Sequence, residues 1–332
     1  MSQDGRPPIH VVVVNWNTGA HLRRCLESIT HSDEVGVLVD RVSVVDNASH
    51  DGSIDGLDDH ELPLEIIRNV TNIGFGAACN QGAGGSSAEY VLFLNPDTTL
   101  LPSTLRVVAS FMNTASADVD ICGVTVTHAD GSPAISCARF PTLRVLVGKS
   151  TGLDHLFPRV FPPHHLSAAE TQDSRYVDQV IGAFFFVRRS LFDELDGFDS
   201  RFFLYYEEVD FARRAVARGR RSYLLTKTSI RHVENVSSAQ APVARLYHSL
   251  RSRRQYVLLH WKRWQERLLF VVTLALEFPA RLVRDGARGG WSAAANVMTS
   301  YRLFVLDVLG RRSGIPEHVA APRGPERGRA AP

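Results

Sequence analysis

The sequence lacks most of the features that identify metal-thiolate, disulfide-rich and nucleic-acid-binding proteins. Its 332 residues contain four cysteines, and no two of them form a CxxC pair. This spacing argues against zinc-thiolate sites and against disulfides, and it predicts reduced, buried thiols in a cytosolic protein. The formal net charge of +2 at pH 7 is too small to support a nucleic-acid partner. Internal repeats are also absent.

Long hydrophobic runs are missing as well. The longest candidate, residues 268–276, is about half the length that a membrane-spanning helix needs, and Glu277 and Pro279 follow it. The first ten residues, MSQDGRPPIH, contain no apolar core of a signal peptide. We therefore expect a cytoplasmic chain that does not cross a membrane but can lie on a membrane surface.

Hydrophobic residues make up 44% of the chain, enough to fill a sizeable core. Short apolar runs alternate with helical segments in the first third, which predicts an α/β fold built from β-α-β units around a parallel sheet. The expected strands are residues 9–14, 42–45, 64–67 and 90–94, with a helix at 20–29. Polar residues follow several of these strands, and ligands of open α/β sheets bind beyond the carboxyl ends of strands.

The remainder of the chain is less regular. Residues 121–137 read as short strands added antiparallel around a turn at Asp130-Gly131, and residues 140–174 read as a long connection with little periodicity. Two short strands are expected at 223–225 and 229–232. The domain boundaries that follow are a tail at 1–8, the α/β domain at 9–240, basic helices at 241–312, and a disordered Pro/Arg/Ala tail at 313–332.

A basic amphipathic helix is expected at about 244–259. Basic residues occupy most of the other positions, and one apolar face of the helix would consist of Leu246, Leu250, Val257, Trp261, Trp264 and Leu268. Such a helix suits an anionic membrane surface. The alternative is a helix packed in a homo-oligomer.

Three carboxylates, Glu207, Glu208 and Asp210, follow an aromatic run at the start of a helical segment. Anions are favoured near the positive end of a helix dipole, and side chains there can project into a cleft. The alternative is an ordinary acidic helix cap. On residue type and position, this cluster is the first candidate for catalysis.

Two further segments suit a nucleotide. Asp46 follows a strand and precedes NASHDGS, so its carboxylate can accept the imide N–H of uracil or thymine while the turn admits a ribose or phosphate. NIGFGAACNQG, at residues 72–82, places closely spaced glycines before a helix of small residues. No Gly-Lys-Ser/Thr follows, and the glycines come after the third strand, which disfavours a Walker A loop and a Rossmann fingerprint.

Asn95-Pro96-Asp97 follows the fourth expected strand. An aspartate with a neighbouring amide can hold a divalent cation that neutralises a diphosphate. His232 could supply a nitrogen ligand to the same ion. The alternatives are a proline-stiffened turn and a histidine with a purely structural hydrogen bond.

The order and spacing of these motifs resemble family 2 inverting glycosyltransferases. The motifs are VVVVNWN, VVDNASHDGS, NIGFGAACNQG, FLNPD and GAFFFVRRSLFDELDGFDSRFFLYYEEVDFARRA. The resemblance covers roughly residues 9–262. The branch that they look like is the rhamnosyltransferase type of bacterial cell-surface polysaccharide synthesis. The resemblance implies a GT-A type fold, a mostly parallel central sheet flanked by helices, with the C-terminal helices as an extension.

The resemblance also implies roles for individual residues. Glu208 would be the general base, Glu207 its close rival, and Asp210 a supporting residue. Asp97 and His232 would hold Mg²⁺ or Mn²⁺, although Asn95 stands where the family motif has its first aspartate. The expected donor nucleotide-binding residues are Asn15, Asp46, Asn47, Ser49, Asn72, Gly74, Gly76, Asn80 and Asn95.

The implied activity is transfer of L-rhamnose from dTDP-rhamnose to a polyprenyl-diphosphate-linked or glycan acceptor, at the cytoplasmic face of the plasma membrane. Other donors, among them UDP-galactofuranose and UDP-GlcNAc, stay open because thymine and uracil present the same imide edge. A non-catalytic nucleotide-sugar-binding module would not need the carboxylate cluster. A nicotinamide oxidoreductase would need glycines where this chain has NWNTG after its first strand.

Overall fold

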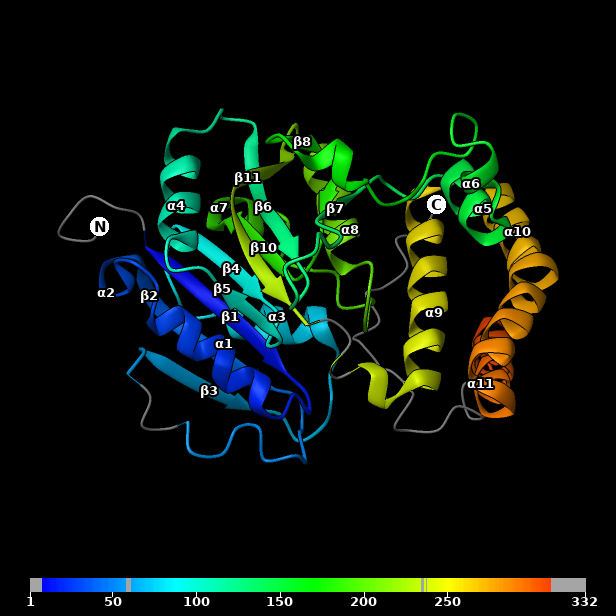
Figure 1. Ribbon diagram of the computed structural model, residues 1–332, viewed down its shortest axis with the longest axis horizontal. Coiled ribbons are helices and arrows are strands. Elements are labelled where there is room, and N and C mark those ends of the chain that lie inside the picture. The colour runs from blue at the N-terminus through cyan, green and yellow to red at the C-terminus, as the bar shows by residue number, and fades with distance from the viewer. Residues whose placement is uncertain (1–7, 58–60, 234–235, 237, 312–332) are drawn as a thin grey trace, which may run out of the picture.

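The structure is a computed structural model that describes residues 8–57, 61–233, 236 and 238–311. The predicted disordered tail at 313–332 and nearly all of the predicted N-terminal tail lie outside these residues. A central sheet with helices on both faces forms one side of the molecule, and a group of C-terminal helices forms the other (Figure 1).

The first half of the sheet is parallel, as the apolar runs predict. Strands β1 (Ile9–Asn15), β2 (Val39–Asp46), β3 (Leu64–Arg68) and β4 (Tyr90–Leu94) lie in the order β3-β2-β1-β4. Every residue of β1 is buried, which explains its run of four consecutive valines at 11–14. The register pairs Asn15 with Asp46, so two of the expected site residues end neighbouring strands.

Beyond β4 the sheet is mixed, which refines the expectation of a mostly parallel sheet. Strand β10 (Phe184–Arg188) runs antiparallel to both β4 and β6 (Val119–Thr127), and β11 (Arg221–His232) runs parallel to β6. The short edge strands β5 (Thr98–Leu100) and β8 (Arg175–Val177) pair antiparallel with β11.

Two expectations for this region were wrong. Residues 121–137 do not form several short strands: β6 is one long strand, and β7 (Cys137–Ala138) pairs with β9 (Gln179–Val180). The expected turn at Asp130-Gly131 is nevertheless present, with an antiparallel bridge between Thr127 and Pro133 across it. The strands expected at 223–225 and 229–232 are a single strand, β11. A register shift between Leu225 and Ser229 interrupts its pairing with β6, which is why the sequence pattern breaks there.

The two faces of the sheet carry separate hydrophobic cores. Ile9, Val11 and Val13 pack on one face with α1 (Ala20–Thr30) and α4 (Thr104–Thr114). Val12 and Val14 pack on the other face with α3 (Phe75–Ala83), α7 (Arg189–Glu194) and α8 (Glu207–Val216). The alternation along β1 follows directly from the two-residue repeat of a strand. The short helix α2 (Val35–Leu38) precedes β2.

The segment 140–174 is more ordered than expected. It contains α5 (Leu143–Thr151), α6 (Leu153–Leu156) and a 3-10 turn, η1 (Ala168–Thr171). The Thr142 hydroxyl accepts a hydrogen bond from the Val145 amide and so caps α5, and Gly152 ends the helix in a left-handed conformation. The surrounding prolines, histidines and glycines conceal this short helix in the sequence.

Four helical segments follow the short turn η2 (Ser238–Gln240). They are α9 (Pro242–His260), α10 (Arg263–Val272), the π-helical turn η3 (Thr273–Glu277) and α11 (Phe278–Val308), which is kinked at Gly290. The helix expected at 244–259 is therefore present as α9. None of the described helices has the length and apolar content needed to cross a membrane.

The predicted apolar face of α9 was partly wrong. Leu250 and Val257 are buried, but α9 ends before Trp261, and both Trp264 and Leu268 belong to α10 and are exposed. The arginines of α9 are not a solvated basic face either. Those at 251, 253 and 254 form ion pairs with acidic residues at 307, 277 and 266, respectively. All four cysteines are buried and unpaired, as predicted.

Candidate active site

The carboxyl ends of β1 and β2 form one wall of the site. The Asn15 side-chain amide donates hydrogen bonds to Asp46 Oδ1 at 2.8 Å, Ser49 Oγ at 3.1 Å and Ser53 Oγ at 2.8 Å. Asp46 is 3% exposed, and its Oδ2 accepts from the Ser49 amide at 3.1 Å. Each carboxylate oxygen keeps lone pairs beyond these bonds, so Asp46 is a fixed acceptor that suits an imide N–H.

The glycine segment brings the start of α3 against this wall and against the acidic segment. Asn47 Nδ2 donates to the Gly74 carbonyl at 3.2 Å, and the Gly74 amide donates to Asn72 Oδ1 at 2.9 Å. Gly74 has a φ of 91°, and a Cβ at this position would lie 2.5 Å from the Phe203 carbonyl oxygen. Only glycine permits this approach. The neighbouring Phe75 amide donates to the same carbonyl at 2.8 Å.

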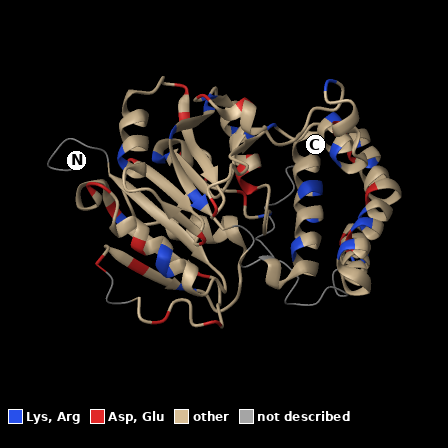
Figure 2. Cartoon of the chain, viewed as in Figure 1, with Lys and Arg blue, Asp and Glu red and all other residues tan. Residues whose placement is uncertain are grey.

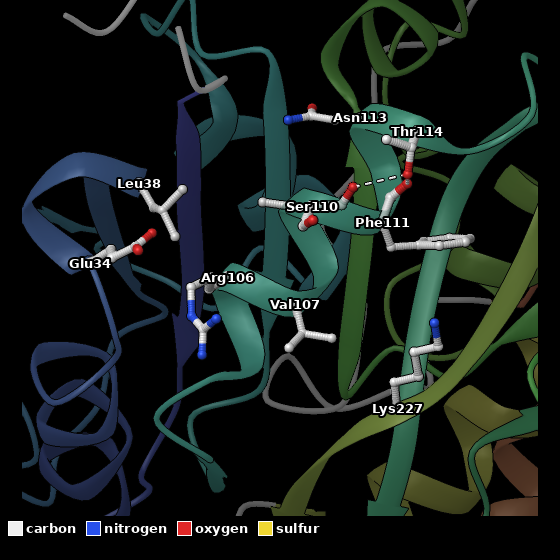
Figure 3. Close-up of a pocket in the computed structure, with 10 residues that line it drawn as sticks. Glu34, Leu38, Arg106, Val107, Ser110, Phe111, Asn113, Thr114 and Lys227 are labelled. Carbon is white, nitrogen blue, oxygen red and sulfur yellow. Dashed lines mark hydrogen bonds between the residues drawn. The ribbon is translucent and has the colours of Figure 1, made fainter. Parts of the chain in front are cut away.

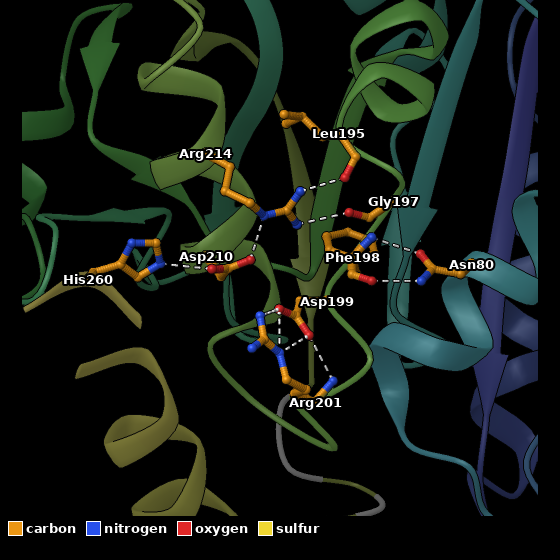
Figure 4. Close-up of polar contacts among 9 residues, drawn as sticks. All are labelled: Asn80, Leu195, Gly197, Phe198, Asp199, Arg201, Asp210, Arg214 and His260. Atoms are coloured by element: carbon orange, nitrogen blue, oxygen red, sulfur yellow. Dashed lines mark hydrogen bonds and ion pairs between the residues drawn. The ribbon is translucent and has the colours of Figure 1, made fainter. Parts of the chain in front are cut away.

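Asn80 and Gly76 hold the acidic segment in place. The Asn80 amide donates to the Phe198 carbonyl at 2.7 Å and accepts from the Phe198 amide at 2.8 Å (Figure 4). This pairing indicates that Asn80 positions the acidic segment. Its expected contact with the donor stays a prediction. A Cβ on Gly76 would lie 3.3 Å from Cβ of Glu207, so α3 and α8 are in close contact there.

The other wall of the site follows β4 and β11. The structure brings Asp97 and His232 together, with His232 Nε2 3.1 Å from Asp97 Oδ1. Asn95 Nδ2 lies 3.5 Å from the same imidazole nitrogen. Both Asp97 and His232 are buried, and His232 Nδ1 has no hydrogen-bond partner in the described parts of the chain.

The donor set here fits a divalent cation only as a partial site. One carboxylate and one imidazole lie within hydrogen-bonding distance, and the described residues contain no group of three or more His, Cys, Asp or Glu side chains arranged to hold a metal. A divalent ion prefers six or more oxygen or nitrogen ligands. Phosphate oxygens of a bound donor and water would have to complete its coordination.

The acidic cluster begins α8 directly after two left-handed residues, Tyr205 and Tyr206, with φ angles of 68° and 72°. Glu207 is buried against α3, and its Oε2 has no hydrogen-bond partner among the described residues. Glu208 is only partly buried. Two consecutive non-glycine residues in this conformation are strained, and such strain is typical of functional sites.

Burial raises the pKa of both glutamates. It is the main cause of the upward shift of the Glu207 pKa, with the adjacent Glu208 carboxylate as the second cause. Burial also raises the pKa of Glu208 to about 7, although backbone amides at the helix start favour its anion. The sequence alone suggested that the helix terminus would favour the anionic form of these carboxyls. The cost of burying a charge outweighs that effect. A carboxylate with a pKa near 7 is suited to general-base catalysis.

Asp210 differs from the two glutamates because both of its oxygens are engaged within the protein. Arg214 Nε donates to one oxygen at 2.7 Å, and His260 Nε2 donates to the other at 2.8 Å (Figure 4). Arg214 also donates to the Leu195 and Gly197 carbonyls at 2.7 and 2.9 Å. Asp210 thus links α8 to the end of α9 and to the loop before the acidic segment. This favours the supporting role over catalysis.

Helix α9 braces the same segment through four residues that sequence reasoning missed. His248 stacks on Phe203, the Ser252 hydroxyl donates to the Leu204 carbonyl at 2.8 Å, and the Tyr256 ring contacts that of Tyr206. His260 binds Asp210, as described above. These four residues, His248, Ser252, Tyr256 and His260, recur every fourth position, so they share one face of a helix. That polar and aromatic spacing was the available signal.

A cavity of about 510 Å³ lies elsewhere, on the side of α4 (Figure 3). Arg106, Ser110 and Asn113 of α4 line it together with Glu34 and Lys227. None of the expected site residues belongs to this cavity. The polar wall at the ends of β1, β2 and β4, and not this cavity, is therefore the candidate site.

Comparisons with known proteins agree with this geometry. The model of the family described as glycosyl transferase family 2 matches residues 10–195. An N-acetylglucosaminyl-diphospho-decaprenol L-rhamnosyltransferase of Mycobacterium tuberculosis is 28% identical over 255 residues, which cover 71% of this chain and 79% of the relative. A protein of Haemophilus influenzae described as an uncharacterized glycosyltransferase is 29% identical over 94 residues, covering 28% of this chain and 31% of its own length.

Solved structures of glycosyltransferases share the fold. The mannosyltransferase PcManGT from Pyrobaculum calidifontis, in complex with GDP-Man and Mn²⁺, has a TM-score of 0.53 at 18% identity and covers 93% of this chain and 84% of its own. GalNAc-T7 with UDP, GalNAc and Mn²⁺ has a TM-score of 0.54 at 15% identity, covering 69% and 44%. The similarity confirms a GT-A fold, with a central sheet flanked by helices and a C-terminal helical segment.

Proposed function

Because this chain belongs to glycosyl transferase family 2, we propose that it transfers L-rhamnose from dTDP-rhamnose, with inversion, to an acceptor on a polyprenyl diphosphate. That it is a glycosyltransferase follows from the family. The choice of rhamnose and of a lipid-linked acceptor is supported by the name of the mycobacterial relative. We place the reaction at the cytoplasmic face of the plasma membrane, as part of cell-envelope glycan synthesis. Self-association of the chain stays a prediction.

The observation that carries the transfer chemistry is the state of Glu208. Inverting transfer needs a base that removes the acceptor hydroxyl proton on the face of the sugar opposite the leaving diphosphate. Glu208 is partly exposed and its pKa is raised to about 7, so it can accept a proton near neutral pH. Glu207 is buried against α3, and this burial raises its pKa well above the usual value, which favours a protonated, structural side chain.

The other residues bind and orient the donor. Asp46, fixed by Asn15 and the Ser49 amide, would accept the imide N–H of the base. Asp97 and His232 would hold a divalent cation at the diphosphate. When bound, such an ion stabilises the charge that develops on the leaving group.

Asp46→Asn should weaken donor binding by roughly tenfold or more, because a carboxylate acceptor becomes an amide that can turn a donor toward the imide N–H. The matched control is Asp55→Asn, an exposed aspartate nearby in the sequence. Isothermal titration calorimetry with dTDP and UDP measures the effect. Equal affinities of the two variants would remove Asp46 from the base-binding role.

Asp97→Asn should lower the affinity for Mn²⁺ in the presence of dTDP by roughly tenfold to a hundredfold, because the only carboxylate of the partial site is lost. Binding of thymidine, which has no phosphate, should not change. Calorimetric titrations with and without Mn²⁺ separate the metal-dependent part of dTDP binding from binding of the nucleoside. Metal-dependent dTDP binding at the wild-type level would exclude an ion at Asp97.

The donor sugar is best tested by a thermal-shift panel of dTDP- and UDP-sugars with Mn²⁺, followed by donor hydrolysis and transfer assays. We expect the largest stabilisation and turnover with dTDP-rhamnose. Preferential turnover of UDP-galactofuranose, UDP-GlcNAc or another hexose donor would reassign the sugar but keep the reaction class.

A further inference from the structure

A continuous apolar stripe runs along the outer face of the C-terminal helices. It consists of exposed residues of α10, η3 and the first part of α11, namely Trp264, Leu268, Val271, Ala275, Leu276, Pro279, Val283 and Ala287. Val283 is 73% exposed and Trp264 is 58% exposed. Leu269 and Val272 on the other side of α10 are buried. The side chains of the stripe therefore do not take part in packing within the described chain.

The π-helical turn keeps this stripe on one face. In an uninterrupted α-helix, Val283 and Ala287 would be rotated by roughly 100° or more from Trp264. The wider turn at Thr273–Glu277 accommodates about one extra residue, which rotates the following helix back by roughly the same angle. The register change therefore aligns the two halves of the stripe.

Positive charge flanks the stripe without exposed negative charge. In residues 262–291, all of them described, five basic side chains are exposed: Lys262, Arg263, Arg267, Arg284 and Arg288. The three acidic residues of the same segment are not exposed: Glu266 and Glu277 are bound to arginines of α9, and Asp285 is bound to Arg284, which leaves four of the five exposed basic side chains without an ion-paired acidic partner in this segment. In Figure 2 blue bands recur along these helices at the side of the molecule away from β3.

We propose that this face of α10 and α11 docks on an anionic lipid surface, with the stripe entering the headgroup region and the arginines on lipid phosphates. Interfacial helices have such an apolar face with tryptophan and basic edges. A second copy of the chain is a poorer occupant, because symmetric contact would bring the two sets of arginines together with no exposed acid to pair with them. The proposal deepens the proposed function, since a lipid-linked acceptor requires the enzyme at a membrane.

This surface replaces the one that the sequence suggested. Arg251, Arg253 and Arg254 of α9 are bound to acidic partners, and α9 packs between the active-site segment and α11. Helices α10 and α11, in contrast, present apolar and basic groups outward together. Docking there leaves the α9 contacts to Phe203, Leu204 and Asp210 unchanged.

Flotation of the full chain with vesicles tests the proposal without any turnover. We expect binding to phosphatidylcholine vesicles that contain phosphatidylglycerol and little binding to phosphatidylcholine alone. Val271→Asp should weaken binding by roughly tenfold or more, since it puts a charge into the apolar face. The control is Val70→Asp, which makes the same change at a more exposed valine on the α/β domain, 96% exposed against 58% for Val271. Arg267→Ala should weaken binding by roughly fivefold, and Arg24→Ala on α1 should not.

Unchanged flotation of Val271→Asp would overturn the proposal. So would a concentration-dependent dimer, seen by sedimentation, that Val271→Asp disperses in the absence of vesicles. If only deletion of residues 313–332 abolished vesicle binding, the tail would be the binding segment, and the proposal would also be overturned. Donor hydrolysis in solution is measured on the same variants and should not change, so failure of the docking surface is distinguished from failure of the proposed transfer.

Discussion

Glu208→Gln is expected to lower the transfer rate by between about a hundredfold and ten-thousandfold while donor binding stays near the wild-type level. Glutamine preserves the size of the side chain but cannot accept the acceptor proton. Because the proton moves only in the transition state, the change should appear in kcat and not in the affinity for the nucleotide-sugar. Transfer assays together with calorimetric donor binding measure both quantities.

Glu207→Gln is the matched control, because it makes the same change one residue earlier. It removes a buried carboxyl whose Oε2 has no partner among the described residues, so the reaction should be affected far less. A larger loss in Glu207→Gln than in Glu208→Gln would exchange the two roles. Near-normal turnover of Glu208→Gln would exclude Glu208 as the base.

The pH dependence supplies a second readout. Since Glu208 must be ionised to act, the transfer rate should rise with pH through about 7, the value to which burial raises its pKa. The same shift has the opposite effect on folding. A carboxyl whose folded pKa exceeds its unfolded pKa stabilises the fold below the unfolded pKa, and this contribution is lost as pH rises through about 7. Denaturant unfolding at several pH values should show that Glu208→Gln removes part of this loss.

Gly74→Ala should lower the free energy of unfolding by about 3 kcal/mol and also reduce transfer. The added Cβ would meet the Phe203 carbonyl oxygen at 2.5 Å, and the φ of 91° is unfavourable for alanine. Relief of the overlap requires α3 to move away from the segment that carries Glu208. Urea unfolding and transfer assays measure the two effects.

Gly131→Ala separates the two causes. Gly131 also has a positive φ, 84°, but no atom lies within 4 Å of its would-be Cβ. It should therefore show only the backbone cost of about 1 kcal/mol, with transfer unchanged. If both variants lost the same stability and kept full activity, the contact between α3 and Phe203 would have no part in holding the site.

Residue patterns predicted the parts of this molecule that depend on local sequence. The β-branched run at 9–14 is buried on both faces as a parallel strand, and the polar residues that follow β1, β2 and β4 lie at one edge of the sheet. Even the approach of Asp97 to His232, which are 135 positions apart in the sequence, was anticipated from the order of motifs.

The parts that sequence could not predict depend on contacts between distant segments. Asn80 stands in a segment that the sequence assigned to donor binding. Only the fold shows that its side-chain amide is paired with the Phe198 backbone. The high pKa of Glu207 results from its enclosure by α3, which no local pattern encodes. Helix α5 was missed because its stability comes from a cap and from burial of Val145 and Leu146, and not from periodicity over a long window.

The face of α9 that holds the acidic segment changes how the catalytic unit of this chain should be defined. The family match ends at residue 195, before Glu208, and the supports of Glu208 continue to His260. A fragment cut at the end of the sheet would retain the donor wall but release Phe203, Leu204 and Asp210 from their partners. Chimeras that exchange the C-terminal helices should therefore join after His260, so that α9 is inherited together with the α/β domain and only α10 and α11 are replaced.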